Sequence, residues 1–194
     1  MKKTLILVAG PPASGKNRVS AELARGLGHA AVIDKDDLCP LVSRIFDLTG
    51  NERDMDGIFC REHIHDAEYE TLLLLARSAL AYEDCAIANA PFGREIRDPV
   101  WLSALRDSLR EDGAALAVLF LLADPACCHE RMLLRGAERD RKKLADYDSY
   151  ASGVRYEPPA GIEDAVDLLA VIDVREPAAH ERTLADALRK LKEE

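Results

Sequence analysis

Gly10, Gly15, Lys16 and Asn17 have the spacing G-x-x-x-x-G-K-N near the amino terminus. This spacing is typical of a phosphate-binding loop, in which glycines let backbone N–H groups curl around phosphate oxygens and the lysine reaches the outer phosphates. The position after the lysine usually carries a Ser or Thr whose hydroxyl binds Mg²⁺. Here Asn17 is the candidate metal ligand, through its amide oxygen. The residues expected to bind the nucleotide are Gly10, Ala13, Ser14, Gly15, Lys16, Asn17 and Arg18.

Three carboxylates follow the second apolar run of the chain, at Asp34, Asp36 and Asp37. Because ligands of an open parallel sheet bind beyond the carboxyl ends of its strands, we expect these side chains to face the phosphates and the substrate. One role for Asp36 or Asp37 is to cap a helix that begins at Leu38. The other is chemical: one carboxylate accepts the proton of a hydroxyl that attacks the γ-phosphate, and another holds the water shell of the metal.

Basic residues gather after the fourth apolar run, where Arg131, Arg135 and Arg139 repeat every four residues on one face of an expected helix. From residue 129 to 143, six Lys or Arg residues stand against three acidic ones. Such a charge run is often a solvated helix face. Arginine also suits bidentate contact with phosphate, so we favour a lid over residues 129–145 that closes on the nucleotide.

Asn89 ends the third apolar run, at a position where an acidic residue often holds Mg²⁺ in phosphate-transferring enzymes. The turn-forming Pro91 and Gly93 follow, so the chain leaves the sheet there. Phe92 and Arg94 are therefore expected to project towards the substrate, with a plain helix entry as the alternative.

A metal site is also conceivable at Cys60, His63, His65 and Asp66, whose residue types are common zinc ligands. On one helix, positions 63 and 65 point about 200° apart, so the two histidines cannot share an ion without breaking the helix. We favour a solvated or substrate-facing helix.

The elements that must position these residues alternate between strand and helix, which predicts an α/β fold with a doubly wound, five-stranded parallel sheet. The expected strands are Thr4–Ala9, Ala30–Ile33, Cys85–Ala90, Ala115–Ala123 and Ala165–Val174. The expected helices are Lys16–Leu27, a short one from Leu38, Ile58–Tyr82, Asp98–Glu111, one after Pro125 and Ala178–Lys192. Residues 1–194 form a single domain in this interpretation, with residues 38–82 as a helical flap that shapes the acceptor pocket.

Composition narrows the function further. The chain has 194 residues, a net charge of -9 and a pI near 5.1, which argues against a broad nucleic-acid-binding surface. No apolar run approaches the roughly 20 residues of a membrane span, and the amino-terminal run is too short for a signal peptide. Five cysteines without a C-x-x-C pair favour a reduced, cytoplasmic protein. The sequence makes no prediction of oligomeric state.

With these residues placed, the chain resembles the P-loop small-molecule kinases of the nucleoside-kinase type, a group that includes zeta toxins, chloramphenicol phosphotransferase, gluconate-kinase-like enzymes and the kinase domain of phage polynucleotide kinase. The likeness rests on the loop, on the stretch Val32–Leu38 and on the stretch Arg131–Arg141. It implies a nucleoside-monophosphate-kinase-like fold, ATP and Mg²⁺ as cofactors, and a small-molecule hydroxyl acceptor. It also implies that Asp36 is the catalytic base, that Lys16, Arg135 and Arg139 stabilise the transferred phosphate, and that Arg131 binds the nucleotide.

Two alternatives stay open. One is a polynucleotide 5′-hydroxyl kinase, against which the acidic charge weighs. The other is a nucleotide-binding regulatory module with weak or no catalysis, suggested by the neutral Asn17 and Asn89. The acceptor itself is not specified: an antibiotic, a sugar acid and a nucleoside-like metabolite are all compatible with the sequence.

Overall fold

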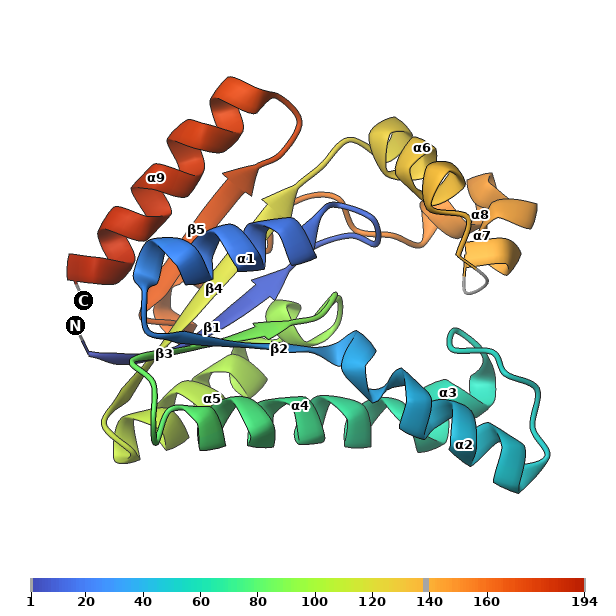
Figure 1. Ribbon diagram of the computed structural model, residues 1–194, viewed down its shortest axis with the longest axis horizontal. Coiled ribbons are helices and arrows are strands. Elements are labelled where there is room, and N and C mark those ends of the chain that lie inside the picture. The colour runs from blue at the N-terminus through green and yellow to red at the C-terminus, as the bar shows by residue number, and fades with distance from the viewer. Residues whose placement is uncertain (1, 138–139, 194) are drawn as a thin grey trace.

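A five-stranded parallel sheet forms the centre of the computed structural model, which describes residues 2–137 and 140–193 (Figure 1). The strands follow the order β2-β3-β1-β4-β5, and every neighbouring pair is parallel. Their bounds are β1 Lys3–Ala9, β2 Ala30–Asp34, β3 Cys85–Asn89, β4 Ala114–Leu122 and β5 Leu168–Asp173. The α/β class and the five-stranded sheet predicted from the sequence are thus confirmed.

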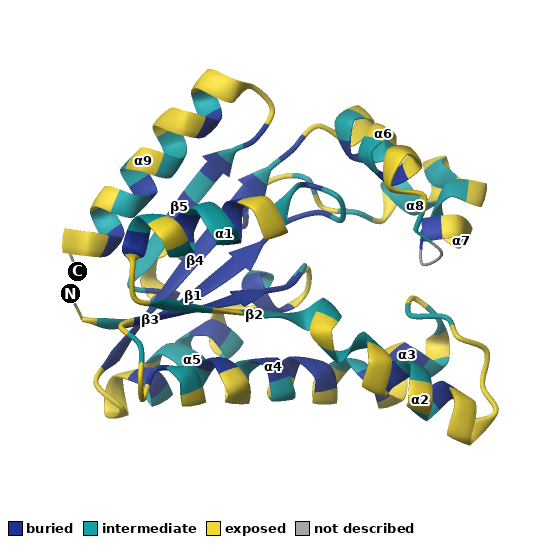
Figure 2. Cartoon of the chain, viewed as in Figure 1, coloured by how far each residue is buried: buried dark blue, intermediate teal, exposed yellow. Residues whose placement is uncertain are grey.

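Helices cover both faces of the sheet. In Figure 1, α1 and α9 lie on one face, and α4 and α5 lie on the other. Their bounds are α1 Lys16–Leu27, α4 His65–Ala79, α5 Pro99–Glu111 and α9 Pro177–Glu193. Each helix turns an apolar stripe towards the strands: Leu23 of α1, Leu72 of α4 and Leu102 of α5 are all fully buried. The three central strands β3, β1 and β4 are the most buried part of the sheet, as Figure 2 shows, which explains their continuous apolar runs.

The carboxyl ends of three strands meet because of the sheet register. Asn89 of β3 lies opposite Val8 of β1 on one side and opposite Asp34 of β2 on the other. The loop after β1, the short 3-10 helix η1 (Lys35–Leu38) after β2 and the turn after β3 therefore leave the sheet side by side. This juxtaposition creates the site described below.

Two helical arms extend beyond the same end of the sheet (Figure 1). The α2–α3 arm comprises α2 (Cys39–Thr49) and α3 (Ile58–His63), which share a small core of Val42, Phe46, Cys60 and Ile64. The α6–α8 arm comprises α6 (Pro125–Arg135), α7 (Arg141–Ala145) and α8 (Tyr147–Ser152). Two further 3-10 helices are η2 (Glu95–Arg97) and η4 (Glu163–Ala165).

One sequence-based helix boundary is wrong. The expected helix over residues 58–82 is two helices, because α3 packs with α2 whereas α4 runs along the sheet, and the chain bends at Ile64, where φ is −119°. Residues 65–79 therefore belong to the layer beneath the sheet. The separation of His63 from His65 on a single helix, used above to disfavour a metal site, rested on that wrong boundary.

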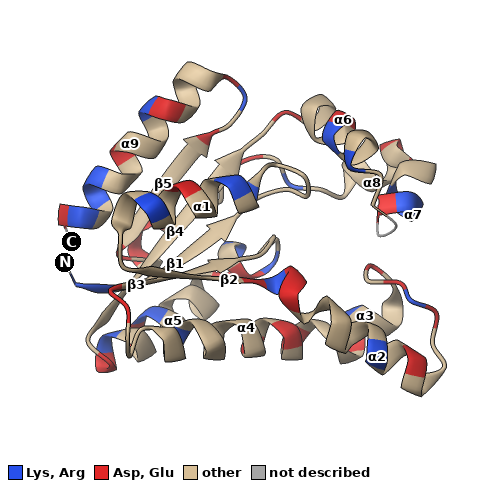
Figure 3. Ribbon diagram, in the orientation of Figure 1, with Lys and Arg blue, Asp and Glu red and all other residues tan. Residues whose placement is uncertain are grey.

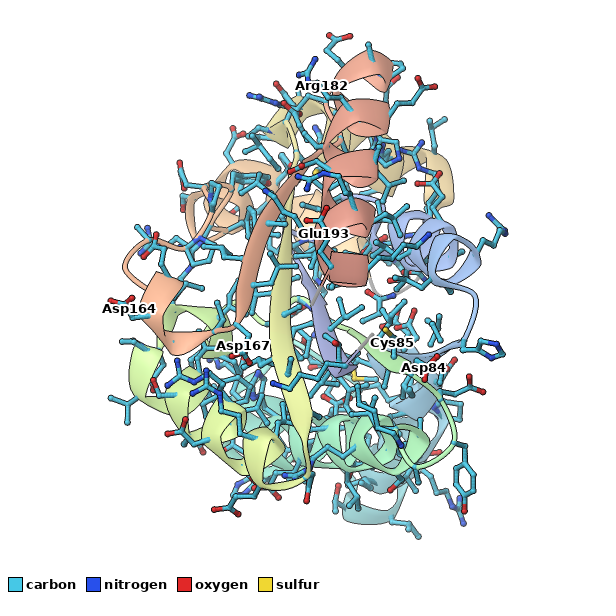
Figure 4. The ribbon with its side chains drawn as sticks, turned by 90° about the vertical axis from the view of Figure 1, so that its left-hand side faces the viewer. Asp84, Cys85, Asp164, Asp167, Arg182 and Glu193 are labelled. Carbon is cyan, nitrogen blue, oxygen red and sulfur yellow. The ribbon has the colours of Figure 1, made fainter. Side chains whose placement is uncertain are left out.

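The amino ends of the strands lie at the opposite end of the molecule, on the side that faces the viewer in Figure 4. Cys85 begins β3 there and is fully buried. Asp167, just before β5, accepts hydrogen bonds from the Leu116 N–H at 2.8 Å and from the Arg110 guanidinium at 2.6 Å. These contacts hold β4 and β5 in register away from the site. In the described part of the chain, no helix has the length and apolar character needed to cross a membrane.

Candidate active site

A cavity of about 780 Å³ opens at the carboxyl ends of β1, β2 and β3. Its walls come from the loop after β1, from η1, from the starts of α3 and α4, from η2, from α6 and from residues 153–155. The size lies within the range of small-molecule sites. Most chemistry-bearing residues singled out in the sequence line this cavity, although they come from segments more than 100 residues apart.

The loop after β1 has the backbone shape of a phosphate cradle. Gly10, Ala13 and Gly15 all have positive φ, at 143°, 60° and 99°, and a Cβ at Gly10 would approach the Leu121 carbonyl oxygen to 3.0 Å. The helix α1 begins directly after Gly15 without a side-chain cap or an acidic residue in its first turn. Its first N–H groups and the positive end of its dipole are therefore available to phosphate.

Lys16 folds back onto this loop. Its Nζ donates hydrogen bonds to the Gly10 carbonyl at 3.1 Å and to the Pro11 carbonyl at 3.0 Å. Burial lowers the pKa of Lys16 to about 8, although the nearby Asp36 carboxylate acts in the opposite direction. A phosphate placed in the cradle would favour the protonated ammonium.

Asn17, Asp34 and Asn89 form a hydrogen-bonded cluster beside the loop. The Asn89 amide donates to Asn17 Oδ1 at 3.0 Å and to Asp34 Oδ2 at 2.8 Å. Asn89 is buried, and its own Oδ1 has no hydrogen-bond partner among the described residues. Carboxylate and amide oxygens are the protein donors that Mg²⁺ prefers, so the cluster fits a magnesium ion. Asp34 lies directly across the register on β2 and places a carboxylate beside Asn89.

The three carboxylates after β2 have three different environments. Asp34, not Asp36 or Asp37, is the helix cap: its Oδ1 accepts the N–H of Asp36 at 2.9 Å. The expectation that Asp36 or Asp37 caps a helix is therefore wrong. Burial, reinforced by the neighbouring carboxylates, raises the pKa of Asp34. Asp36 lines the cavity, whereas Asp37 is exposed and is not among its lining residues.

Two predicted arginines lie on α6. Arg131 Nη1 donates to the Ser14 carbonyl at 3.0 Å and to the Ala13 carbonyl at 3.4 Å, which ties α6 to the phosphate cradle. Arg135 holds the buried Asp140 carboxylate through Nε at 2.9 Å and Nη2 at 2.6 Å. Arg139 lies outside the described residues. The idea of one helical face through positions 131, 135 and 139 is wrong, because α6 ends at Arg135 and Gly136 turns left-handed.

Two further expectations are corrected. Arg18 does not line the cavity; it is exposed on the first turn of α1, 3.6 Å from Glu22. Phe92 is fully buried and packs edge-on against Tyr69 with ring centres 5.2 Å apart, because its φ of 48° turns the side chain into the core beneath the sheet. Arg94, by contrast, does line the cavity, and its Nη2 lies 2.5 Å from Asp66 Oδ1.

The sequence-based predictions missed a set of charged side chains on the acceptor side. The Lys35 ammonium lies 3.2 Å from Glu68 Oε1, and both residues line the cavity with little exposure. Arg97 and Arg155 also line it. A local signal existed for Glu68 alone, as an acidic residue on the buried face of a helix. Lys35, Arg97 and Arg155 could be recognised only from the residues that lie near them in space. Within residues 2–137 and 140–193, no group of three or more His, Cys, Asp or Glu side chains is arranged to hold a metal ion.

Charged side chains also connect the two arms. In Figure 3, acidic and basic residues of η1 and α7 lie at the end of the molecule where the two arms extend. Lys142 of α7 lies 2.6 Å from Glu52 and 2.9 Å from Asp54, and Lys143 lies 3.0 Å from Asp56. These ion pairs join the α6–α8 arm to the α2–α3 arm across the cavity mouth.

Comparison with known proteins gives the class. A family model described as an AAA domain matches residues 5–155, and the chain belongs to this family. No curated protein matches the sequence. The resemblance to P-loop small-molecule kinases is confirmed at the level of fold by the solved structures described next.

A gluconokinase from Sinorhizobium meliloti 1021 has a TM-score of 0.57 and 22% identity, covering 98% of this chain and 93% of that chain. A sugar kinase from Janibacter sp. HTCC2649 has a TM-score of 0.58 and 19% identity, covering 98% of this chain and 95% of that chain. A shikimate kinase from Bacteroides thetaiotaomicron has a TM-score of 0.50 and 16% identity, covering 99% of both chains. These identities establish a shared fold; activity has to be argued from the site.

Proposed function

We propose that this protein is an ATP-dependent kinase that transfers the γ-phosphate to a hydroxyl group of a small molecule in the cytoplasm. The observation that carries the proposal is that Asp36 lines the same cavity as the phosphate cradle and Lys16, close enough for the carboxylate to affect the pKa of the lysine. The phosphate cradle and a candidate base thus share one cavity. The kinase fold of the neighbouring structures supports the same conclusion.

The cradle binds the donor. The N–H groups after Gly10 and at the start of α1 hold the β- and γ-phosphate oxygens, and Lys16 leaves the Gly10 and Pro11 carbonyls to meet them. Arg131 keeps α6 beside the cradle through the Ser14 carbonyl. Binding therefore replaces hydrogen bonds within the loop by charge-assisted ones to phosphate.

Asp36 acts on the acceptor. As the acceptor hydroxyl oxygen bonds to the γ-phosphorus, the bond from that phosphorus to the β–γ bridging oxygen breaks and ADP leaves. The hydroxyl proton passes to the Asp36 carboxylate. Asp34 is poorly suited to this role, because both of its oxygens already accept hydrogen bonds, from the Asp36 N–H and the Asn89 amide.

Asp34 and Asn17 are the residues that would hold Mg²⁺, directly or through water, with Asn89 fixing both of their oxygens. When bound, the ion neutralises charge on the β- and γ-phosphates. The cluster tolerates Asn17 in place of the usual hydroxyl because Asp34 provides the negative charge.

The two arms close over the cavity. In this proposal α6 and α7 form the lid, and the α2–α3 arm forms the acceptor-side flap. Arg135 stabilises the transferred phosphate once the γ-phosphate is in place. It does so either after its hydrogen bonds to Asp140 break or while it still holds Asp140. The ion pairs of Lys142 and Lys143 hold the lid over the flap while transfer takes place.

The base assignment is tested by two neighbouring substitutions in η1. Asp36→Asn should lower phosphoryl transfer by at least about 100-fold, because the proton loses its acceptor. Asp37→Asn removes the same charge one residue later, outside the cavity, and should keep near wild-type turnover. Transfer of label from γ-labelled ATP to a panel of hydroxylated metabolites and antibiotics measures both, with ATP binding checked by calorimetry. Wild-type turnover by Asp36→Asn would contradict the role.

A thermal-shift measurement, combined with the transfer assay, tests the regulatory-module alternative, which the neutral Asn17 and Asn89 favour. A kinase should be stabilised by ATP more strongly with Mg²⁺ than without it, measured as a shift in Tm. Stabilisation by ATP that ignores Mg²⁺, together with no transfer to any acceptor, would establish the module instead. Binding of an oligonucleotide that weakens steeply with salt would point to the polynucleotide kinase.

A further inference from the structure

Two arginines of the cavity form no ion pair with a carboxylate among the described residues. Arg97, at the end of η2, and Arg155, which follows α8, both line the cavity. Arg97 Nη2 donates to the main-chain carbonyl of Glu157 at 2.6 Å, and its guanidinium lies 6.0 Å from the centre of the Phe120 ring. Its Nε is buried and has no hydrogen-bond partner among the described residues. The side chain is thus held in place, with one donor still unsatisfied.

Two other arginines of the cavity, Arg94 and Arg135, are paired with carboxylates. Arg94 lies within 3.3 Å of the Asp66 and Glu95 carboxylates, and Arg135 holds Asp140. Arg131 donates to the carbonyls of the phosphate cradle. For Arg97 and Arg155, the ion pairs among the described residues include no carboxylate, since Arg97 reaches only a carbonyl oxygen. Arg61 of α3, which is exposed, also lines the cavity.

The two guanidinium groups also repel each other. Burial holds the pKa of Arg97 below its usual value, the charge of Arg155 adds to the effect, and the Glu157 carboxylate acts in the opposite direction. Arg97 is partly buried and Arg155 is exposed. A second cation near the partly buried Arg97 guanidinium costs free energy, which an anion between the two would offset. A buried unpaired donor adds to that cost. An anionic ligand would relieve both at once.

The position of Arg97 separates this anion from the donor phosphates. Arg97 follows β3, whose neighbour β2 leads into Asp36, whereas the residues at the phosphate cradle are Lys16 and Arg131. In this arrangement Asp36, after β2, supplies the base for the acceptor, and Arg97, after the neighbouring β3, supplies the contact to its anionic group. Guanidinium groups suit planar, bidentate recognition of carboxylate and phosphate.

We infer that the acceptor is a hydroxylated small molecule with an anionic group, a carboxylate or a phosphate, which Arg97 and Arg155 hold while its hydroxyl faces Asp36. This inference rests on the proposed kinase function and narrows its substrate class. It excludes neutral polyols and cationic aminoglycoside-like antibiotics as the preferred acceptors. It also gives the segment after α8 a part in the site, because Arg155 completes the anion contact.

The test pairs each anionic acceptor with a neutral counterpart: D-gluconate and D-glucose 6-phosphate against D-sorbitol and D-glucose, and D-glycerate against glycerol, together with cationic aminoglycosides. Phosphoryl transfer is followed with γ-labelled ATP. We expect anionic members to be the preferred substrates, and the better of the carboxylates or phosphates identifies the group. A neutral or cationic molecule as the best acceptor would overturn the inference while leaving the kinase function intact.

Variants localise the contact. Arg97→Gln and Arg155→Gln should each raise the acceptor KM at least tenfold with a smaller change in kcat, and should leave the KM for ATP within about twofold. Arg25→Gln, which removes a charge from the exposed end of α1, is the control and should change neither. An unchanged acceptor KM, or an effect on the KM for ATP alone, would refute the anion contact and assign the arginines elsewhere.

A binding measurement keeps the inference testable if no acceptor is phosphorylated and the kinase function fails. Side-chain N–H resonances of the arginines are followed by NMR in the wild-type protein during titration with D-gluconate, D-glucose 6-phosphate and D-glucose. A saturable shift of the Arg97 Nε–H signal with an anion but not with glucose, lost in Arg155→Gln, supports an anion site. No shift with either anion refutes it.

Discussion

The chemistry of the cavity depends on single residues whose environments the fold has made unequal. Lys16 is held by two loop carbonyls, Asp34 is locked by the Asp36 N–H and Asn89, and Asp36 lines the cavity. Three aspartates at the end of β2 and in η1 therefore differ: Asp34 orders the cluster, Asp36 lines the cavity and Asp37 faces solvent. Burial and hydrogen bonding, more than residue type, assign these roles.

The lowered pKa of Lys16 predicts a pH dependence of ATP binding. In the free protein the ammonium is mostly protonated below pH 8 and loses its proton above it. Bound phosphates favour the protonated form, so affinity is fully present below pH 8 and falls as the pH rises through it. The Kd for ATP should increase about tenfold between pH 7 and pH 9, as measured by calorimetry. Lys16→Met should bind weakly with no such pH dependence, and a flat profile for the wild-type protein would contradict the prediction.

At the scale of elements, ion pairs between side chains connect the two arms. Lys142 and Lys143 of α7 reach Glu52, Asp54 and Asp56 in the loop between α2 and α3. Exposed ion pairs contribute little free energy and are screened by salt. Contacts of this kind break at little cost in free energy, which agrees with the lid and flap proposed above.

Hydrogen exchange can test whether these pairs hold the arms together. In the double variant Lys142→Gln, Lys143→Gln, amides of residues 50–57 should exchange roughly two- to fivefold faster, because the loop loses its partners. The control is Lys190→Gln, which removes an ion pair with Asp186 on the distant α9. Mass spectrometry of the peptide that covers residues 50–57 reports the rates. Equal rates in all three proteins would show that the pairs do not restrain the loop.

At the scale of the whole molecule, stability comes from two apolar layers pressed against the sheet. One lies between the strands and α4 and α5, and the other between the strands and α1 and α9. Leu72 of α4 is fully buried in the first layer, whereas Leu74, two residues later, is 65% exposed.

These two leucines provide a matched test of the layers. Leu72→Ala should lower the free energy of unfolding by about 2–5 kcal/mol, because it leaves a cavity against the sheet. Leu74→Ala should change it by no more than about 0.5 kcal/mol. Urea unfolding followed by circular dichroism measures both. Similar losses for the two variants would mean that α4 is rotated relative to the sheet.

The sequence by itself determined the sheet, the order of helices and strands, and the phosphate cradle. Continuous apolar runs such as β1 can be buried only between two layers, and the glycines at positions 10 and 15 permit positive φ. These are local signals, and the family match and the shared fold agree with them. The candidate base could be placed too, because it directly follows a strand end.

Only the tertiary structure decided which side chains face the cavity. Phe92 turned into the core through a local backbone angle, Arg18 turned to solvent, and the bend at Ile64 moved α4 beneath the sheet. Asn89 gained its partners Asn17 and Asp34 through the parallel register, and Arg97 and Arg155 became neighbours across nearly 60 residues of sequence. The physical reason is that such contacts depend on the packing of segments far apart in the chain, which the local pattern of residues does not encode.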